Sequence, residues 1–234
     1  MKKRVEFGLV LSMIFLSLVT FGQMKASESK NDNSGKGTPK THLDLMVNVV
    51  RTNLNYGGAN SDLADYKKSR NGIQAGASFQ AGITPAFSLV SELYFMRKGG
   101  ELKSNNSLTT HESNLYLNTI ELPVLGRFHF GKFYMNAGPS IAYNLSGNKK
   151  VKDISTKLSF QNSTEGVKRF DAGIQMGGGV EFPFKEKRIA LDIRYNYGLT
   201  NIAYTKEIYN RAVMISAHFS KPWKKNPLGR NNSL

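Results

Sequence analysis

The stretch IALDIRYNYGLT, residues 189–200, decides the fold class. Its bulky apolar and aromatic residues occupy every second position, and Asp192, Arg194 and Asn196 lie between them. Alternation with a period of two sorts residues onto the two faces of a β-strand, whereas a helix would spread these charges around its axis. The segment is therefore predicted to be a strand with one apolar and one polar face.

The same alternation recurs along the chain and predicts eight strands. They are expected at residues 43–56, 72–83, 87–98, 114–130, 133–145, 170–182, 189–201 and 212–220. The connections alternate between short (84–86, 131–132, 183–188) and long, polar ones (57–71, 99–113, 146–169, 202–211). An up-and-down barrel with short turns at one rim and long loops at the other produces this alternation. The predicted fold is an all-β, eight-stranded antiparallel up-and-down barrel.

The two faces of these strands favour a barrel that spans a membrane. Most of the predicted strands reach the roughly 9–11 residues that a tilted membrane-spanning strand needs. The face opposite the bulky apolar residues carries Gly, Ser, Asn, Gln and charges, which suit the crowded interior of a small barrel. A soluble periplasmic ligand-binding barrel is the alternative, and it would turn Ile193 inward and Asp192 and Arg194 outward.

The chain ends predict export. Lys2, Lys3 and Arg4 precede an apolar run over residues 7–21, which is typical of a signal peptide over residues 1–22. A disordered lead is expected at 23–41, the barrel domain at 42–220 and a basic periplasmic tail at 221–234. With an even number of strands, both termini are expected on the short-turn side, in the periplasm. The predicted location is the cell outer membrane, with a cleaved signal peptide.

Composition limits the partners. The 234 residues contain no Cys, which excludes a disulfide scaffold, and 32 Lys and Arg against 17 Asp and Glu give a net charge of +15. Export argues against nucleic acid, so the expected partners are outer-membrane lipid and glycolipid, and the barrel-assembly machinery during insertion. The four His, at 42, 111, 129 and 218, show no ligand spacing, so neither a metal nor a cofactor is expected.

Charged residues on the polar face predict a network inside the lumen. Extending the alternation turns inward the acidic residues Asp44, Glu92, Glu121, Asp171, Glu181 and Asp192, and the basic residues Lys98, Arg127, Arg194 and His218. Because an unpaired charge in such an interior costs several kcal/mol, these groups are expected to pair and plug the lumen. A gated ion path or a catalytic carboxylate is the alternative. The triplet Gly177-Gly178-Gly179 is interpreted as strand curvature or close lumen packing.

Two further groups are candidate sites on the long loops. Lys149, Lys150, Lys152 and Lys157 lie in a predicted loop over 147–157 and are candidates for contact with anions or glycolipid. His111 with Ser113 or Ser107 is the pair that a lipid-modifying barrel enzyme would use. The predicted loop over 99–113 that contains these residues is rich in Ser, Thr and Asn, so a His near a Ser arises there from composition alone. The chain is therefore predicted not to be an enzyme.

The ordered set of stretches resembles the PorT-like outer-membrane β-barrel domain family of Bacteroidota, a relative in architecture of the OmpA and OmpX barrels. The similar stretches are SELYFMRKG (91–99), IELPVL (120–125), AGP (137–139), FDAG (170–173) and RYNYGLTNI (194–202), and the resemblance covers residues 43–219. It implies an integral outer-membrane protein with a structural or interaction role. The family takes its name from a member tied to type IX secretion, so the resemblance also implies envelope or secretion-complex proteins as partners.

Overall fold

The computed structural model describes residues 41–184 and 187–220. The predicted signal peptide (1–22), the predicted tail (221–234) and all but the last residue of the predicted lead lie outside the described residues. Within those residues, no helix is both long and apolar enough to cross a membrane.

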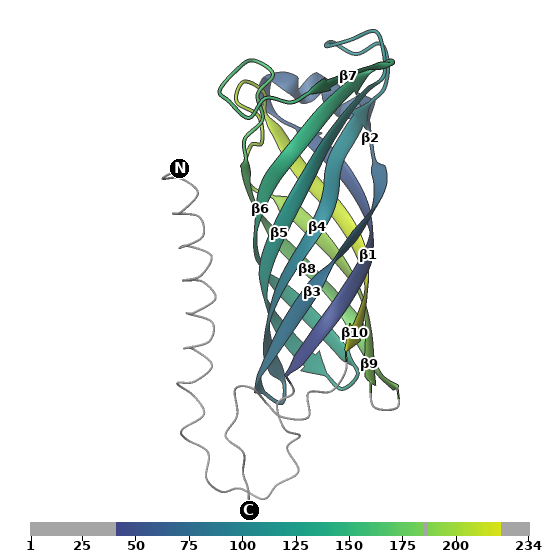
Figure 1. The fold of residues 1–234 in the computed structure, drawn as a ribbon, viewed down its shortest axis with the longest axis vertical. Coiled ribbons are helices and arrows are strands. Elements are labelled where there is room, and N and C mark those ends of the chain that lie inside the picture. Colours follow the sequence, from purple (N-terminus) through teal and green to yellow (C-terminus); the bar gives the residue numbers. More distant parts are fainter. Residues whose placement is uncertain (1–40, 185–186, 221–234) are drawn as a thin grey trace, which may run out of the picture.

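Eight long strands form the body of the molecule (Figure 1). They are β1 (His42–Tyr56), β3 (Arg70–Thr84), β4 (Phe87–Leu102), β5 (Ser113–Phe130), β6 (Phe133–Val151), β8 (Phe170–Phe184), β9 (Lys187–Gly198) and β10 (Ile208–Ser220). The short strand β2 (Lys67–Lys68) pairs with β4, and β7 (Ile154–Lys157) pairs with β6. A 3-10 helix, η1 (Gly58–Tyr66), follows β1.

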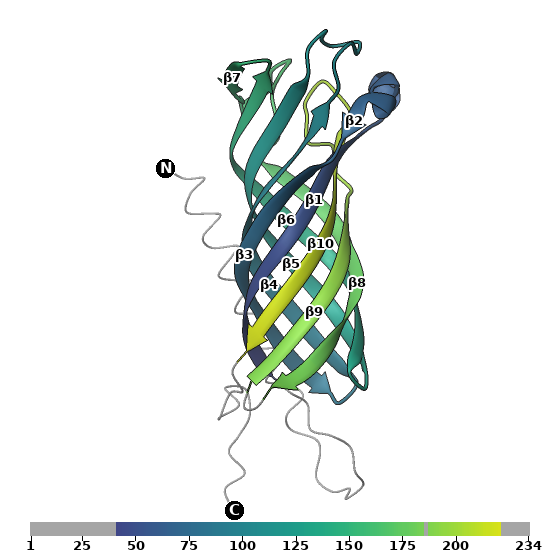
Figure 2. The same ribbon diagram turned by 90° about the vertical axis from the view of Figure 1, so that its right-hand side faces the viewer.

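Antiparallel pairing runs around the whole sheet and closes it. The long strands neighbour one another in the order β4-β3-β1-β10-β9-β8-β6-β5, and β4 also pairs with β5. The first and last strands pair with Asp44 opposite Ser220, so the described chain begins and ends at the short-turn end (Figures 1 and 2). The predicted eight-stranded antiparallel barrel is confirmed.

The alternation in β9 shows which face is outside. Ile193 and Tyr195 are 56% and 39% exposed, whereas Asp192 and Arg194 are 4% and 1% exposed. The other strands follow the same rule, with Leu45 and Val47 of β1 outside and Asp44 inside. An apolar exterior around a polar interior is the arrangement of a membrane barrel, and the soluble binding-barrel alternative is wrong for this chain.

β4, β6 and β10, which begins at Ile208, extend clearly further toward the long-loop end than the alternation predicted. β4 runs to Leu102, and β6 runs to Val151 and forms a hairpin with β7. The predicted loop over 147–157 is therefore a β-hairpin, in which Leu158 also donates its backbone N–H to the carbonyl of Gly147 at 2.9 Å. The prediction failed because this part of β6 is almost entirely polar, so no apolar face marks it as a strand.

The long loops and the adjoining strand ends share a hydrophobic core at the long-loop end of the barrel. We call it the loop-end cap; its buried residues are Leu54, Tyr56, Leu63, Leu102, Leu117, Val167 and Ile202. Leu63 comes from η1 and Ile202 from the β9–β10 loop, and both are fully buried. Since these side chains come from β1, η1, β4, β5 and the β7–β8 and β9–β10 loops, the loops pack as one unit above the lumen.

Candidate functional site

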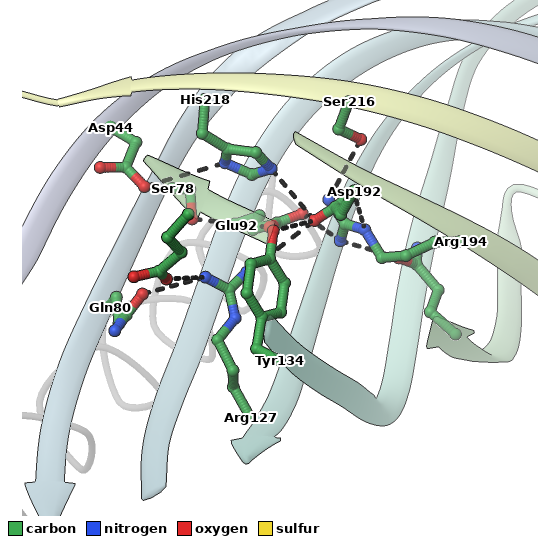
Figure 3. Close-up of polar contacts among 12 residues, drawn as sticks. Asp44, Ser78, Gln80, Glu92, Arg127, Tyr134, Asp192, Arg194, Ser216 and His218 are labelled. Carbon is green, nitrogen blue, oxygen red and sulfur yellow. Dashed lines mark hydrogen bonds and ion pairs between the residues drawn. The ribbon is translucent and has the colours of Figure 1, made fainter. Parts of the chain in front are cut away.

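Arg194 lies at the centre of the lumen and holds two carboxylates (Figure 3). It donates from Nη1 to Glu92 Oε2 at 2.7 Å and from Nε to Asp192 Oδ1 at 3.1 Å. Further donor contacts reach Gln175 and Ser216, both at 3.4 Å. The guanidinium is fully buried, so its charge is balanced by side chains from β4 and β9 and not by bulk solvent.

A second group of charges fills the short-turn end. Arg188 donates to Asp44 Oδ2 at 2.5 Å and to Glu181 Oε1 at 2.6 Å, and it also reaches Gln80 Oε1 at 3.1 Å. Arg127 donates to the same Gln80 oxygen at 3.0 Å. These contacts tie β1, β3, β5, β8 and β9 together across the lumen.

Asp192 connects the two groups. Its Oδ2 accepts a hydrogen bond from the Tyr134 hydroxyl at 3.1 Å and lies 3.3 Å from Nε2 of His218. The Arg127 guanidinium stacks on the Tyr134 ring, 4.0 Å from its centroid. His218 also lies 3.8 Å from Asp44, so one buried imidazole bridges the carboxylates of β1 and β9 (Figure 3).

A third group lies nearer the long loops. Lys98 Nζ is 2.5 Å from Glu121 Oε2 and 3.5 Å from Asp171 Oδ2. Glu121 also accepts hydrogen bonds from Gln175 at 2.8 Å and Asn196 at 2.9 Å. We call these three groups of side chains together the lumen network.

The glycine triplet makes room for this network. A Cβ added at Gly177 would lie 2.6 Å from Cγ of Arg194, and one at Gly179 would lie 2.5 Å from Cζ of Tyr134. Both distances are shorter than any real Cβ contact, so only glycine leaves space for the arginine and the tyrosine beside β8. The structure thus gives these glycines a packing role in the lumen.

The structure brings the predicted lumen residues together on the inside of the barrel. Glu92, Glu121, Arg127, Asp171, Asp192 and Arg194 are all buried, and Glu181 is partly buried with a side chain 21% exposed. Arg188 was not among the predicted lumen residues; it belongs to β9 and not to the predicted short turn over 183–188. The inward positions of Ala190 and Asp192 extend to residue 188 by the same period of two, and that signal could have found it.

Three of the four predicted anion-contact lysines, Lys149, Lys152 and Lys157, line one pocket at the β6–β7 hairpin. Lys149 and Lys150 lie on β6 and Lys157 on β7, while Lys152 occupies the turn between them with a φ of 54°. Lys149 donates to Glu165 at 2.7 Å, and Lys206 donates to the other oxygen of that carboxylate at 3.0 Å. Hydrogen bonding from Lys149 is the main cause that holds the pKa of Glu165 below its usual value. Lys149 is therefore engaged in a loop-to-loop ion pair.

The residues considered for enzymatic chemistry differ in exposure. His111 and Ser107 are exposed on the β4–β5 loop, whereas Ser113 is buried at the start of β5. The backbone N–H of His111 donates to Thr109 Oγ1 at 3.0 Å, as in a local turn. Among the described residues, no hydrogen bond joins the His111 imidazole to Ser107 or Ser113, the contact by which a base activates a nucleophile.

The family comparison agrees with this architecture. The family model described as outer membrane protein beta-barrel domain matches residues 22–204. No curated protein matches the sequence.

Several solved structures are similar at low identity. Ail, the attachment invasion locus protein of Yersinia pestis, is 11% identical with a TM-score of 0.42, over 77% of this chain and 99% of that chain. Neisserial surface protein A is 12% identical with a TM-score of 0.45, over 77% and 97% of the two chains. OprG from Pseudomonas aeruginosa is 10% identical with a TM-score of 0.43, over 81% and 97%.

Proposed function

The chain belongs to the outer membrane protein beta-barrel domain family and is an outer-membrane β-barrel protein, and from this premise we propose that it is a closed scaffold that presents its long-loop end to other envelope molecules. In this proposal the short turns and both termini face the periplasm and the long loops face outward, as in other outer-membrane barrels. The signal peptide over residues 1–22 is part of the same proposal. The role is structural and interactive, not enzymatic.

The observation that carries the proposal is that the lumen is filled at two levels. The lumen network occupies the centre and the short-turn end, with Arg194 and Arg127 each 1% exposed. The loop-end cap covers the other end with side chains such as Leu63, Leu117 and Ile202, all fully buried. An eight-stranded barrel leaves an interior only wide enough for its own side chains, so this packing supports a closed lumen and not a wide pore.

The loop-end cap also supports the interaction role. Binding surfaces work best on segments whose order is already established, because less conformational entropy is lost on binding. Above the cap, the loop tips expose large apolar side chains: Ile154 at 73%, Leu108 at 46% and Tyr204 at 38%. Apolar groups on a pre-ordered surface fit a protein partner. The PorT resemblance proposes secretion or envelope-assembly proteins for this position.

Conductance of the full chain in planar bilayers tests the closed lumen. Wild-type protein is expected to show no long-lived open state at low voltage. A variant that removes three lumen charges, R127A/E92A/R194A, is expected to conduct, provided that it still shows heat-modifiable migration on gels. A stable open channel in the wild-type protein would contradict the proposal.

Site-specific photo-crosslinking in cells tests the interaction role. A crosslinker at Ile154 or Leu108 is expected to capture a defined envelope protein, whereas one at Lys132 in the short β5–β6 turn serves as the matched control. Equal capture of the same protein from both ends would contradict the proposed use of the long-loop end.

A further inference from the structure

On several strands, the apolar exterior of the barrel ends toward the long loops at an outward arginine or asparagine. Going toward the long loops, the outward position after Val49 of β1 is Arg51, and the one after Phe95 of β4 is Arg97. On β10 the outward position after Val213 is Arg211. On β3 and β5 the corresponding outward residues are Asn71 and Asn118. A band of arginine and asparagine on β1, β3, β4, β5 and β10 therefore marks the outer edge of the lipid-facing surface.

Four outward arginines at this edge lack an acidic partner. We call Arg51, Arg97, Arg169 and Arg211 the arginine girdle. Arg169 immediately precedes β8, is exposed, and lies 5.7 Å from the centroid of the Tyr143 ring of β6. Among residues 41–184 and 187–220, no ion pair joins any of the four to a carboxylate, whereas the lumen arginines 127, 188 and 194 each have at least one. The girdle thus carries positive charge that the described chain does not neutralise, in a protein with a net charge of +15.

Aromatic rings contact three of the girdle arginines, and backbone carbonyls also accept hydrogen bonds from Arg169 and Arg211. The Arg211 guanidinium lies 3.6 Å from the centroid of Tyr197, and the Arg169 guanidinium lies 4.3 Å from that of Phe160. Arg97 donates from Nε to Asn118 at 3.2 Å. Stacking on a ring uses the flat face of a guanidinium. Among the described residues, only Nη1 of Arg169 and of Arg211 donates to the chain, so the N–H groups of Nε and Nη2 are left to match the oxygens of a phosphate.

A groove on the barrel wall lies beside Arg97. The β3–β4 ladder stops at the pair Gln74–Met96, and β4 next pairs with β2, at Lys68–Glu101. The interruption leaves a groove of roughly 690 Å³. Its lining combines the apolar side chains of Val49, Ile73 and Phe95 with Arg70, Arg97 and Tyr116. One part of the groove suits an acyl chain, and the other suits an anion.

We propose that the arginine girdle binds the phosphate groups of outer-leaflet glycolipid, and that the groove beside Arg97 holds one such lipid with its acyl chain against Val49, Ile73 and Phe95. The inference rests on the proposed orientation, which places the long loops outside the cell. The arginine girdle is positively charged and the surface directly below it is apolar, so the matching ligand has both an anionic head and apolar chains. A membrane glycolipid with phosphate groups has this chemistry, and a soluble anion has only half of it.

The opposite edge of the barrel supports the same orientation. Toward the short turns the outward side chains include five phenylalanines, all at least 44% exposed, and the exposed Lys187 of β9; the phenylalanines are Phe130, Phe133, Phe182, Phe184 and Phe219. The two edges thus differ in composition, as do the two leaflets of an asymmetric membrane. The arginines lie at the edge that the proposed orientation gives to the phosphate-rich leaflet.

Lipid binding to the purified full chain in detergent tests the proposal by native mass spectrometry. The probes are diphosphorylated lipid A, its dephosphorylated form and inorganic phosphate. Diphosphorylated lipid A is expected to bind, and the dephosphorylated form at least tenfold more weakly. Each of R97Q and R211Q is expected to weaken lipid A binding about fivefold, because one basic side chain near an anionic surface contributes on the order of that factor.

The control variant is K150Q/K157Q, which removes two positive charges from the β6–β7 hairpin and leaves the girdle intact. It is expected to bind lipid A as the wild type does. Loss of binding in this variant with full binding in R97Q would overturn the proposal, as would displacement of lipid A by equimolar inorganic phosphate or binding of the dephosphorylated form with equal affinity. If the wild-type protein shows no open channel in planar bilayers and also binds no lipid A, only the proposal of lipid binding by the girdle is refuted. If it forms an open channel but binds lipid A normally, only the proposal of a closed scaffold is refuted.

Discussion

Replacing Arg194 by Met is expected to lower the free energy of unfolding by about 3–5 kcal/mol, because it leaves a buried carboxylate without its partner. Asp192 would keep its contacts with Tyr134 and His218, at 3.1 and 3.3 Å. Glu92 would keep, among the described residues, a contact with the Ser78 hydroxyl at 3.5 Å in place of its ion pair at 2.7 Å. The cost is therefore concentrated on Glu92.

This reasoning also predicts a rescue. The double variant E92Q/R194M removes the unpaired charge along with the arginine, and it is expected to recover a large part of the lost stability, since a buried ion pair replaced as a unit costs little. The assay is urea unfolding of the full chain in vesicles, followed by the fraction that migrates in the compact form on unboiled gels. K157M, which removes an exposed charge from β7, is the control and is expected to change stability by less than about 0.5 kcal/mol. An R194M variant as stable as K157M would refute the account of the lumen network.

Three further outcomes follow from the packing and the loops. Gly177→Val is expected to cost about 1–3 kcal/mol in the same urea assay, because the new side chain would overlap Arg194; unchanged stability would show that β8 does not pack as described. Leu63→Ala opens the loop-end cap, so proteases are expected to cut the long loops faster while the barrel keeps its compact gel migration, and equal cleavage rates would contradict the cap. Because Lys149 holds the pKa of Glu165 below its usual 4.5, the stabilisation from this carboxylate is present above that pH and is lost as the pH falls through the lowered pKa. Hydrogen exchange in residues 158–167, corrected for intrinsic rates, is expected to quicken at low pH in the wild type and to lose that pH dependence in Glu165→Gln.

The barrel could be predicted from the sequence because one local property, the period of two, encodes both the strand and its orientation. In β9 the alternation from Ile189 to Tyr197 correctly assigns each side chain to the lumen or the exterior. It also placed Glu92 and Arg194 inside. Their pairing was beyond the sequence, because the contact between β4 and β9 crosses the lumen between residues 102 positions apart.

The outer end was harder to predict for a physical reason. Beyond the membrane both faces of a strand meet water or other loops, so the apolar face that marks a strand disappears. For this reason the polar sequence of the β6–β7 hairpin predicts a loop. The loop-end cap was missed because Leu63, Val167 and Ile202 are isolated apolar residues in polar segments, and only the closed barrel brings them together.

Oxygen accessibility of nitroxide labels along β9 tests the central claim most directly, that the apolar face of the barrel meets lipid and the charged face fills the lumen. The chain has no Cys, so single cysteines at positions 190–197 can each carry one label without background. In lipid vesicles, labels at 191, 193 and 195 are expected to be highly accessible to oxygen, which concentrates in the bilayer, and labels at 190, 192, 194 and 196 are expected to be shielded. A uniform profile, or one with the even positions more accessible to oxygen, would contradict the account.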